Sequence, residues 1–182
     1  MTFGTVLRMA ALAVALMAAG PAFAQAQTGG NTYVKETHGA WEIRCLERQD
    51  GPDPCQMFQR LNDANGTPTA EVNLFSIAPG QAAAAGMVVV TPLETLLQAQ
   101  LGLQIDSAGA KRYPFAWCTE AGCIVRIALT PAELEAMKKG NRASVTIVPA
   151  AAPNSSVVLN ASLSGFTAAF NAMQAANAAP AQ

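Results

Sequence analysis

Residues 40–61 read AWEIRCLERQDGPDPCQMFQRL and contain a strand, a turn and a returning strand. Apolar and charged side chains alternate over residues 40–47, and this period of two is typical of a half-buried β-strand. Residues 51–54 read GPDP, a turn-forming sequence, so residues 55–61 are expected to return as the partner strand. The stretch therefore predicts a β-hairpin whose two strands each carry a cysteine.

Similar patterns continue along the chain and predict a β-rich fold. Further strands are expected at residues 69–77, 86–91, 101–105, 113–117, 123–129, 142–149 and 156–163. A capping box of Thr130 and Glu133 predicts a helix that ends at Gly140, and a second helix is expected over residues 164–173. Short strands without a repeating strand–helix–strand rhythm predict an all-β protein, an antiparallel β-sandwich with one or two short helices.

The two ends of the chain do not fit this pattern. Residues 1–24 combine Arg8, an apolar stretch and the terminal Ala-Phe-Ala of a signal-peptidase site, so we expect a signal peptide that is cleaved after Ala24. The apolar stretch is too short to cross a bilayer of roughly 30 Å as a helix. Residues 25–35 are predicted to be a flexible N-terminus, residues 36–173 the folded domain, and residues 174–182 a disordered alanine-rich tail.

The composition argues against several classes of function. A formal net charge of -1 and only 13% charged residues are not those of a nucleic-acid-binding protein, and no membrane-spanning segment follows the signal peptide. The single histidine, His38, argues against histidine-based metal sites. His38 could act as a general base, but no nucleophile motif accompanies it, so a surface role is favoured and we expect no enzyme activity, cofactor or metal.

The four cysteines are expected to form disulfides, because an exported protein meets an oxidising compartment. Four cysteines allow three pairings, which the sequence alone does not separate. Proximity favours Cys45–Cys55 and Cys118–Cys123, since each of these pairs flanks a turn sequence. The nine residues between Cys45 and Cys55 make a zinc site of two tight cysteine pairs less favourable.

Two groups of side chains are candidate contact sites. The basic group contains Lys138, Lys139 and Arg142, which either compensate a helix dipole or contact an anionic surface. The aromatic group contains Tyr113, Phe115 and Trp117, which are predicted on one side of a strand and either pack in the core or line a ligand groove.

The order of these segments resembles the invasion-associated locus B (IalB) family of exported bacterial proteins. The resemblance depends on residues 39–45 (GAWEIRC), 55–57 (CQM), 101–106 (LGLQID), Cys118 with Gly122 and Cys123, Leu134 with residues 138–140 (KKG), and 162–169 (SLSGFTAA). It spans residues 36 to 173 and departs at the alanine-rich segment 82–85 and at the tail.

The resemblance implies a β-rich protein of the periplasm or cell envelope of a Gram-negative bacterium, with no known catalytic residues and, in some pathogenic relatives, a link to host-cell invasion. We therefore expect a non-enzymatic protein that is periplasmic, or secreted or envelope-associated. It would act through contacts with an envelope or host protein of unknown identity, and its oligomeric state is unknown. The alternative is a periplasmic binding protein for a small apolar or sugar-like ligand. A hydrolase is the least favoured hypothesis.

Overall fold

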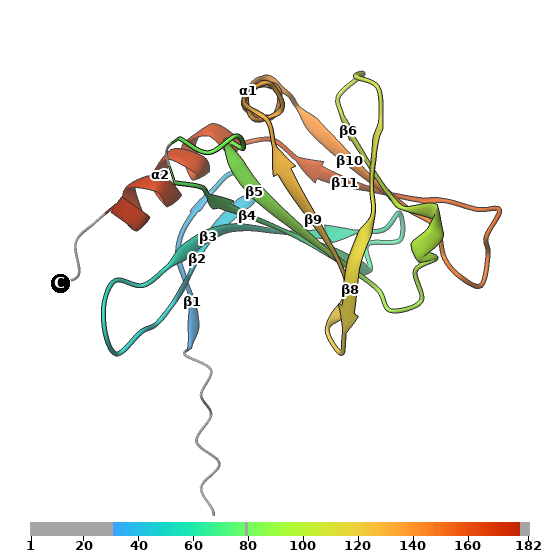
Figure 1. The fold of residues 1–182 in the computed structure, drawn as a ribbon, viewed down its shortest axis with the longest axis horizontal. Coiled ribbons are helices and arrows are strands. Elements are labelled where there is room, and N and C mark those ends of the chain that lie inside the picture. The colour runs from blue at the N-terminus through green and yellow to red at the C-terminus, as the bar shows by residue number, and fades with distance from the viewer. Residues whose placement is uncertain (1–30, 79, 179–182) are drawn as a thin grey trace, which may run out of the picture.

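The computed structural model describes residues 31–78 and 80–178, which form two antiparallel sheets packed face to face (Figure 1). The larger sheet has seven strands in the order β1-β2-β3-β4-β5-β9-β8, and the smaller has four in the order β11-β10-β6-β7. The strands of the larger sheet are β1 (Thr32–His38), β2 (Trp41–Leu46), β3 (Cys55–Asn62), β4 (Pro68–Ser76), β5 (Ala85–Thr91), β9 (Gly122–Leu129) and β8 (Phe115–Thr119). Those of the smaller sheet are β11 (Val157–Ser162), β10 (Arg142–Ile147), β6 (Leu101–Ile105) and β7 (Lys111–Tyr113). The predicted antiparallel sandwich is confirmed.

Two helices and one short 3-10 turn complete the described chain. Helix α1 (Pro131–Lys139) begins with the expected capping box, in which the Thr130 hydroxyl accepts a hydrogen bond from the Glu133 N–H. Helix α2 (Phe166–Ala178) packs on the inner face of the larger sheet, beside the smaller sheet (Figure 1). The 3-10 turn, Leu97–Ala99, lies in the connection between β5 and β6.

The core joins the two sheets and α2 through large aromatic side chains. Trp41 meets Phe166 edge to face at 5.4 Å, and Phe166 stacks with Phe170 at 6.2 Å. All three rings are buried, and the Trp41 Nε1–H donates a hydrogen bond of 2.9 Å to the carbonyl oxygen of Ser162 on the smaller sheet. These three rings are among the largest buried side chains of the core, so their packing contributes strongly to the stability of the fold.

Two glycines allow α2 to start directly against the β1–β2 turn. Gly39 and Gly165 both have positive φ angles, 58° and 80°. A Cβ on Gly39 would lie 2.5 Å from the Ser164 carbonyl oxygen, and one on Gly165 would overlap the backbone of His38. Only glycine therefore fits at either position.

Both predicted flexible ends are wrong where the structure describes them. Residues 32–35 belong to β1, where Val34 pairs with Arg44, and this edge strand is exposed on both faces, so its sequence lacks alternation. Residues 174–178 continue α2, because alanine favours helix and the Asn177 amide bonds the backbone N–H and C=O of Cys55 at 2.8 and 2.9 Å. The expected signal peptide, residues 25–30 and residues 179–182 lie outside the described residues.

Candidate functional site

A row of five side chains crosses the outer face of the larger sheet, the face away from the core. Arg60 pairs with Glu71, Glu71 with Val90, Val90 with Ile124, and Ile124 with Trp117. These residues lie on five adjacent strands, so the row is about 19 Å long at a strand spacing of about 4.8 Å. We call these five residues the outer row.

Trp117 joins the outer row because strand β8 contains a β-bulge. Phe115 pairs with Val125 while Trp117 pairs with Ile124, so one extra residue lies between them on β8. In a regular strand Phe115 and Trp117 would share a face. The bulge instead leaves Phe115 packed against the core and turns Trp117 outward, where 48% of it is exposed.

The prediction that three aromatic residues share one strand face is therefore wrong. Pro114, which has no N–H for a sheet ladder, separates β7 from β8. Tyr113 ends β7 in the smaller sheet, whereas Phe115 begins β8 in the larger sheet. The three rings consequently lie in three different environments.

Arginine side chains cover Phe58, an aromatic ring on the outer face. Phe58 points outward yet is only 3% exposed, because the Arg44 guanidinium lies 3.3 Å above its ring and that of Arg60 lies 5.9 Å away. Arg44 is held by Glu42 at 2.8 Å, and Arg60 pairs with Glu71 at 3.5 Å. Arg60 and Glu71 are both substantially exposed, so the outer row presents a charge of each sign beside apolar surface.

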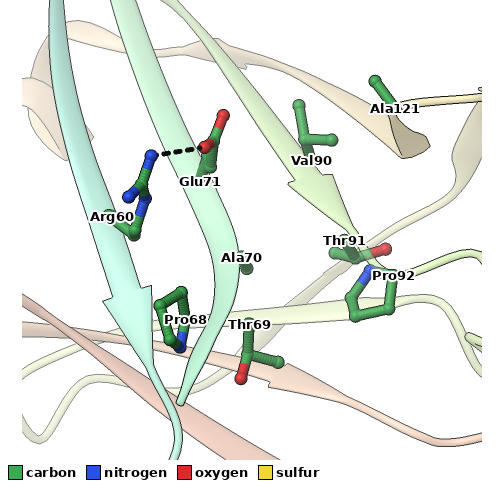
Figure 2. Close-up of a pocket in the computed structure, with 9 residues that line it drawn as sticks. All are labelled: Arg60, Pro68, Thr69, Ala70, Glu71, Val90, Thr91, Pro92 and Ala121. Atoms are coloured by element: carbon green, nitrogen blue, oxygen red, sulfur yellow. Dashed lines mark ion pairs between the residues drawn. The ribbon is translucent and has the colours of Figure 1, made fainter. Parts of the chain in front are cut away.

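A hollow of ≈ 340 Å³ lies at the Arg60–Glu71 end of the outer row (Figure 2). Its lining residues are Arg60, Pro68, Thr69, Ala70, Glu71, Val90, Thr91, Pro92 and Ala121. The ion pair forms part of one wall, and Val90, Pro92 and Ala121 supply apolar surface (Figure 2). The hollow thus combines an exposed ion pair with apolar surface.

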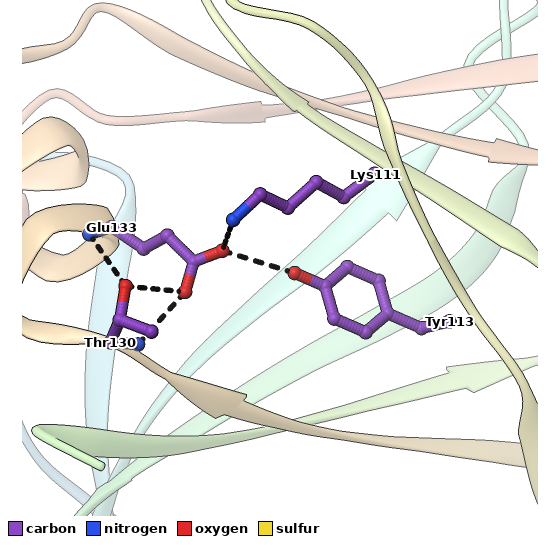
Figure 3. A network of polar contacts seen from close by, with 4 residues as sticks. All are labelled: Lys111, Tyr113, Thr130 and Glu133. Atoms are coloured by element: carbon purple, nitrogen blue, oxygen red, sulfur yellow. Dashed lines mark hydrogen bonds and ion pairs between the residues drawn. The ribbon is translucent and has the colours of Figure 1, made fainter. Parts of the chain in front are cut away.

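A second hollow, of ≈ 240 Å³, lies between the β6–β7 hairpin and helix α1. Leu103, Ile105 and alanines line its apolar part. Its polar part is the carboxylate of Glu133, where Lys111 and the Tyr113 hydroxyl meet one oxygen and Thr130 meets the other (Figure 3). Of the three predicted groove residues, only Tyr113 lines this space.

The contacts of the Glu133 carboxylate with Lys111 and Thr130 also determine its charge state. Partial burial favours a higher pKa for Glu133, but hydrogen bonds from Lys111 and from the N–H and hydroxyl of Thr130 outweigh it and lower the pKa to about 2. Partial burial and the nearby Glu133 carboxylate raise the pKa of Tyr113. The site is therefore a fixed carboxylate with a neutral phenol at neutral pH.

The predicted basic group is only partly free to contact an anionic surface. Lys138 bonds Glu135 at 2.9 Å and lies 5.3 Å from the Phe170 ring. Lys139 and Arg142 are exposed. The structure thus leaves two of the three cations exposed.

Two disulfides each join adjacent strands. Cys45 is bonded to Cys55 across β2 and β3, and Cys118 to Cys123 across β8 and β9. The structure thus contains the pairing that proximity favours. The second disulfide directly follows Trp117 and holds the β8–β9 hairpin closed beside the outer row.

His38 lies within β1 rather than before the first strand, and its Nε2 atom is 2.9 Å from the Glu36 carboxylate. In the part of the chain that the structure describes, no group of three or more His, Cys, Asp or Glu side chains is placed to hold a metal ion. Over residues 31–78 and 80–178, no helix is long and apolar enough to cross a membrane.

Phe58, Arg60 and Glu71 were not predicted as site residues from the sequence. A signal for the ion pair was available, because Arg60 and Glu71 lie on either side of the turn at residues 62–68, where a hairpin places them opposite each other. The position of Phe58 could not be predicted in this way. From the sequence alone, an aromatic residue that arginines cover on the outer face cannot be distinguished from a residue of the core.

These features define a small β-sandwich protein with two hairpin disulfides and a structured outer sheet face. The chain belongs to the invasion associated locus B (IalB) family, whose model matches residues 41–174. Invasion protein B homologs from Brucella abortus strain 2308 and from biovar 1 strain 9-941 are each 28% identical over 155 residues, which is 85% of this chain and 87% of theirs. The resemblance seen in the sequence is therefore confirmed.

A solved structure shows the same fold. The crystal structure of invasion associated protein B from Bartonella henselae matches with a TM-score of 0.62 and 22% sequence identity, and covers 81% of this chain and 99% of that one.

Proposed function

We propose that the chain is an exported protein of the Gram-negative periplasm or envelope that acts without catalysis, through contact between its outer sheet face and an envelope or host protein. The expected signal peptide and the two disulfides support export. The names of the relatives support a role connected with host-cell invasion.

One observation carries the contact proposal: the bulge that turns Trp117 into solvent. A regular strand would have kept this side chain on the core-facing side, where burial stabilises it. Tryptophan and arginine are the residues that most often dominate the energy of protein interfaces. Trp117 and Arg60 lie at the two ends of the outer row, and the hollow beside Arg60 offers a place for a partner side chain.

Site-specific photo-cross-linking in the cell envelope of living bacteria tests this proposal. A photo-reactive amino acid at position 117 is expected to capture a defined protein. The same amino acid at Gln174, which is exposed on α2 and so lies away from the outer face, serves as the control. Equal capture at both positions, or none at position 117, would count against the outer face as the contact surface.

A second candidate function is supported by the hollow at Tyr113. Its apolar lining and single fixed carboxylate suit a small, mostly apolar or sugar-like ligand that donates a hydrogen bond. Native mass spectrometry of gently purified protein would reveal such a ligand as an additional mass on the chain. The fraction of protein that carries this mass should fall in the variants Tyr113→Phe and Ala136→Phe.

A further inference from the structure

The described sheets have four edge strands, β1, β8, β7 and β11. An edge strand presents unpaired N–H and C=O groups, and proteins usually protect it with charges, bulges, proline or short length. The four edges differ sharply in this respect.

Three of the edges are protected. Strand β1 has a bulge between Val34 and Glu36 and carries Lys35 in it. Strand β8 has the bulge before Trp117 and is tied to its neighbour by a disulfide. Strand β7 has only three residues, of which two are the cations Lys111 and Arg112.

Strand β11 has none of these features. Its six residues, VVLNAS, include no charge and no proline, and its pairing with β10 runs without a register shift from Ile147–Val157 to Arg142–Ser162. Val158 is 51% exposed, and Asn160 is also exposed. Among the four edges of the described sheets, β11 is therefore the one best suited to add another strand.

The hydrogen bonds at one end of β11 show which backbone groups are free. Ser162 points away from β10, because its N–H donates to the Gln59 side chain at 2.8 Å and its C=O accepts from Gln59 and Trp41 at 2.9 Å. Backbone groups alternate along a strand, so Val158 and Asn160 point to the same free side. The buried Gln59 amide thus provides hydrogen-bond partners for the backbone N–H and C=O of Ser162. It does not reach the corresponding backbone groups of Val158 and Asn160.

We propose that β11 pairs in antiparallel fashion with β11 of a second copy of this chain, with the two Val158 residues opposite each other on the two-fold axis. Asn160 then faces Ser156 of the other copy, and the exposed N–H and C=O groups of Ser156, Val158 and Asn160 gain partners. The two smaller sheets become one continuous eight-stranded sheet.

A second copy fits this edge because the strand is complementary to itself. An antiparallel pair of identical strands has two-fold symmetry, and like charges would repel each other across its axis. The strand carries no charge, the two Val158 side chains make an apolar contact, and small polar side chains face each other on either side. Val157, which is only partly buried, would lie next to Leu159 of the other copy and become more buried. This inference does not depend on the outer sheet face.

Sedimentation of the purified exported chain over a concentration series tests the proposal. We expect a monomer–dimer equilibrium in the wild type that Val158→Lys weakens at least about tenfold, because it places two like charges opposite each other. Val34→Lys is the matched control, since Val34 is also a valine that is 51% exposed on an edge strand, and it should leave the equilibrium unchanged. Circular dichroism and melting temperatures would show that both variants are folded.

Four results would overturn the proposal. The first is a wild-type chain that stays monomeric up to about 1 mM, where association would be too weak to matter. The second is a dimer that Val158→Lys leaves intact. The third is equal weakening by Val34→Lys, which would show a general effect of charge. A different protein bound at β11 in place of the second copy would also contradict self-pairing.

Discussion

The side chain of Glu133 connects helix α1 to strand β7 of the smaller sheet. Its carboxylate closes the capping box of α1, bonds Lys111 and Tyr113 on β7, and thereby ties the smaller sheet to the helix. The capping box could be predicted from local sequence, because it depends on residues three positions apart. The contacts with Lys111 and Tyr113 could not be predicted in this way. They depend on the tertiary fold, which brings together residues that are twenty or more positions apart in the sequence.

The low pKa of Glu133 predicts an acid-sensitive contribution to stability. Its folded-state pKa of about 2 lies below the ordinary 4.5, so the ionised group stabilises the fold above pH 4.5 and loses this effect as the pH falls toward 2. Glu133→Gln should lower the free energy of unfolding by about 1–3 kcal/mol at pH 7. Urea denaturation at pH 7 and at pH 2.5 should show this difference shrinking. Glu135→Gln, on the exposed side of α1, is the control, and an equal loss there would contradict the assignment.

Gln59 supports a second prediction about a single residue. It is buried and makes two hydrogen bonds with the Ser162 backbone, so Gln59→Leu leaves that N–H and C=O without this partner. We expect a loss of about 1–3 kcal/mol in unfolding free energy, measured by urea denaturation. Gln56→Leu on the outer face of the same strand should cost clearly less, because Gln56 is only half-buried and bonds the Asn73 side chain. Equal costs would argue against the proposed role of Gln59.

Secondary structure elements could be predicted where one face is buried and the other is exposed. Strands β2 and β9 and the start of α1 carry this alternation or an explicit cap. Strand β1 was missed because both of its faces are exposed. The bulge in β8 was also missed, because a shift of one residue changes the face of Trp117 without any change in composition.

Helix α2 is expected to contribute strongly to stability. Phe170 is 2% exposed and stacks on Phe166, so Phe170→Ala should destabilise the fold by about 3–5 kcal/mol through lost burial and an internal cavity. Phe75→Ala is the matched control, because Phe75 is a half-buried phenylalanine that lies over Gly86 on the outer face. Thermal and urea denaturation would measure both. A smaller loss for Phe170→Ala than for Phe75→Ala would contradict the assigned core.

The order of strands over the whole molecule creates the surfaces on which both proposals depend. Strand β9 lies beside β5, with a crossing to the smaller sheet between them in the chain. This non-local pairing brings Ile124 and Trp117 next to Val90 and completes the outer row. Hairpin partners could be predicted from the sequence, but this pairing could not, because no local pattern specifies which distant strand becomes a neighbour.

The central claim for the whole molecule is that it is exported and held by two disulfides. Intact mass spectrometry of the chain recovered from the cell envelope, alkylated without prior reduction, tests this claim most directly. We expect the mass of residues 25–182 with no alkyl group, since Cys45–Cys55 and Cys118–Cys123 are bonded. A chain that retains residues 1–24 and carries an alkyl group on each of its four cysteines would contradict the account.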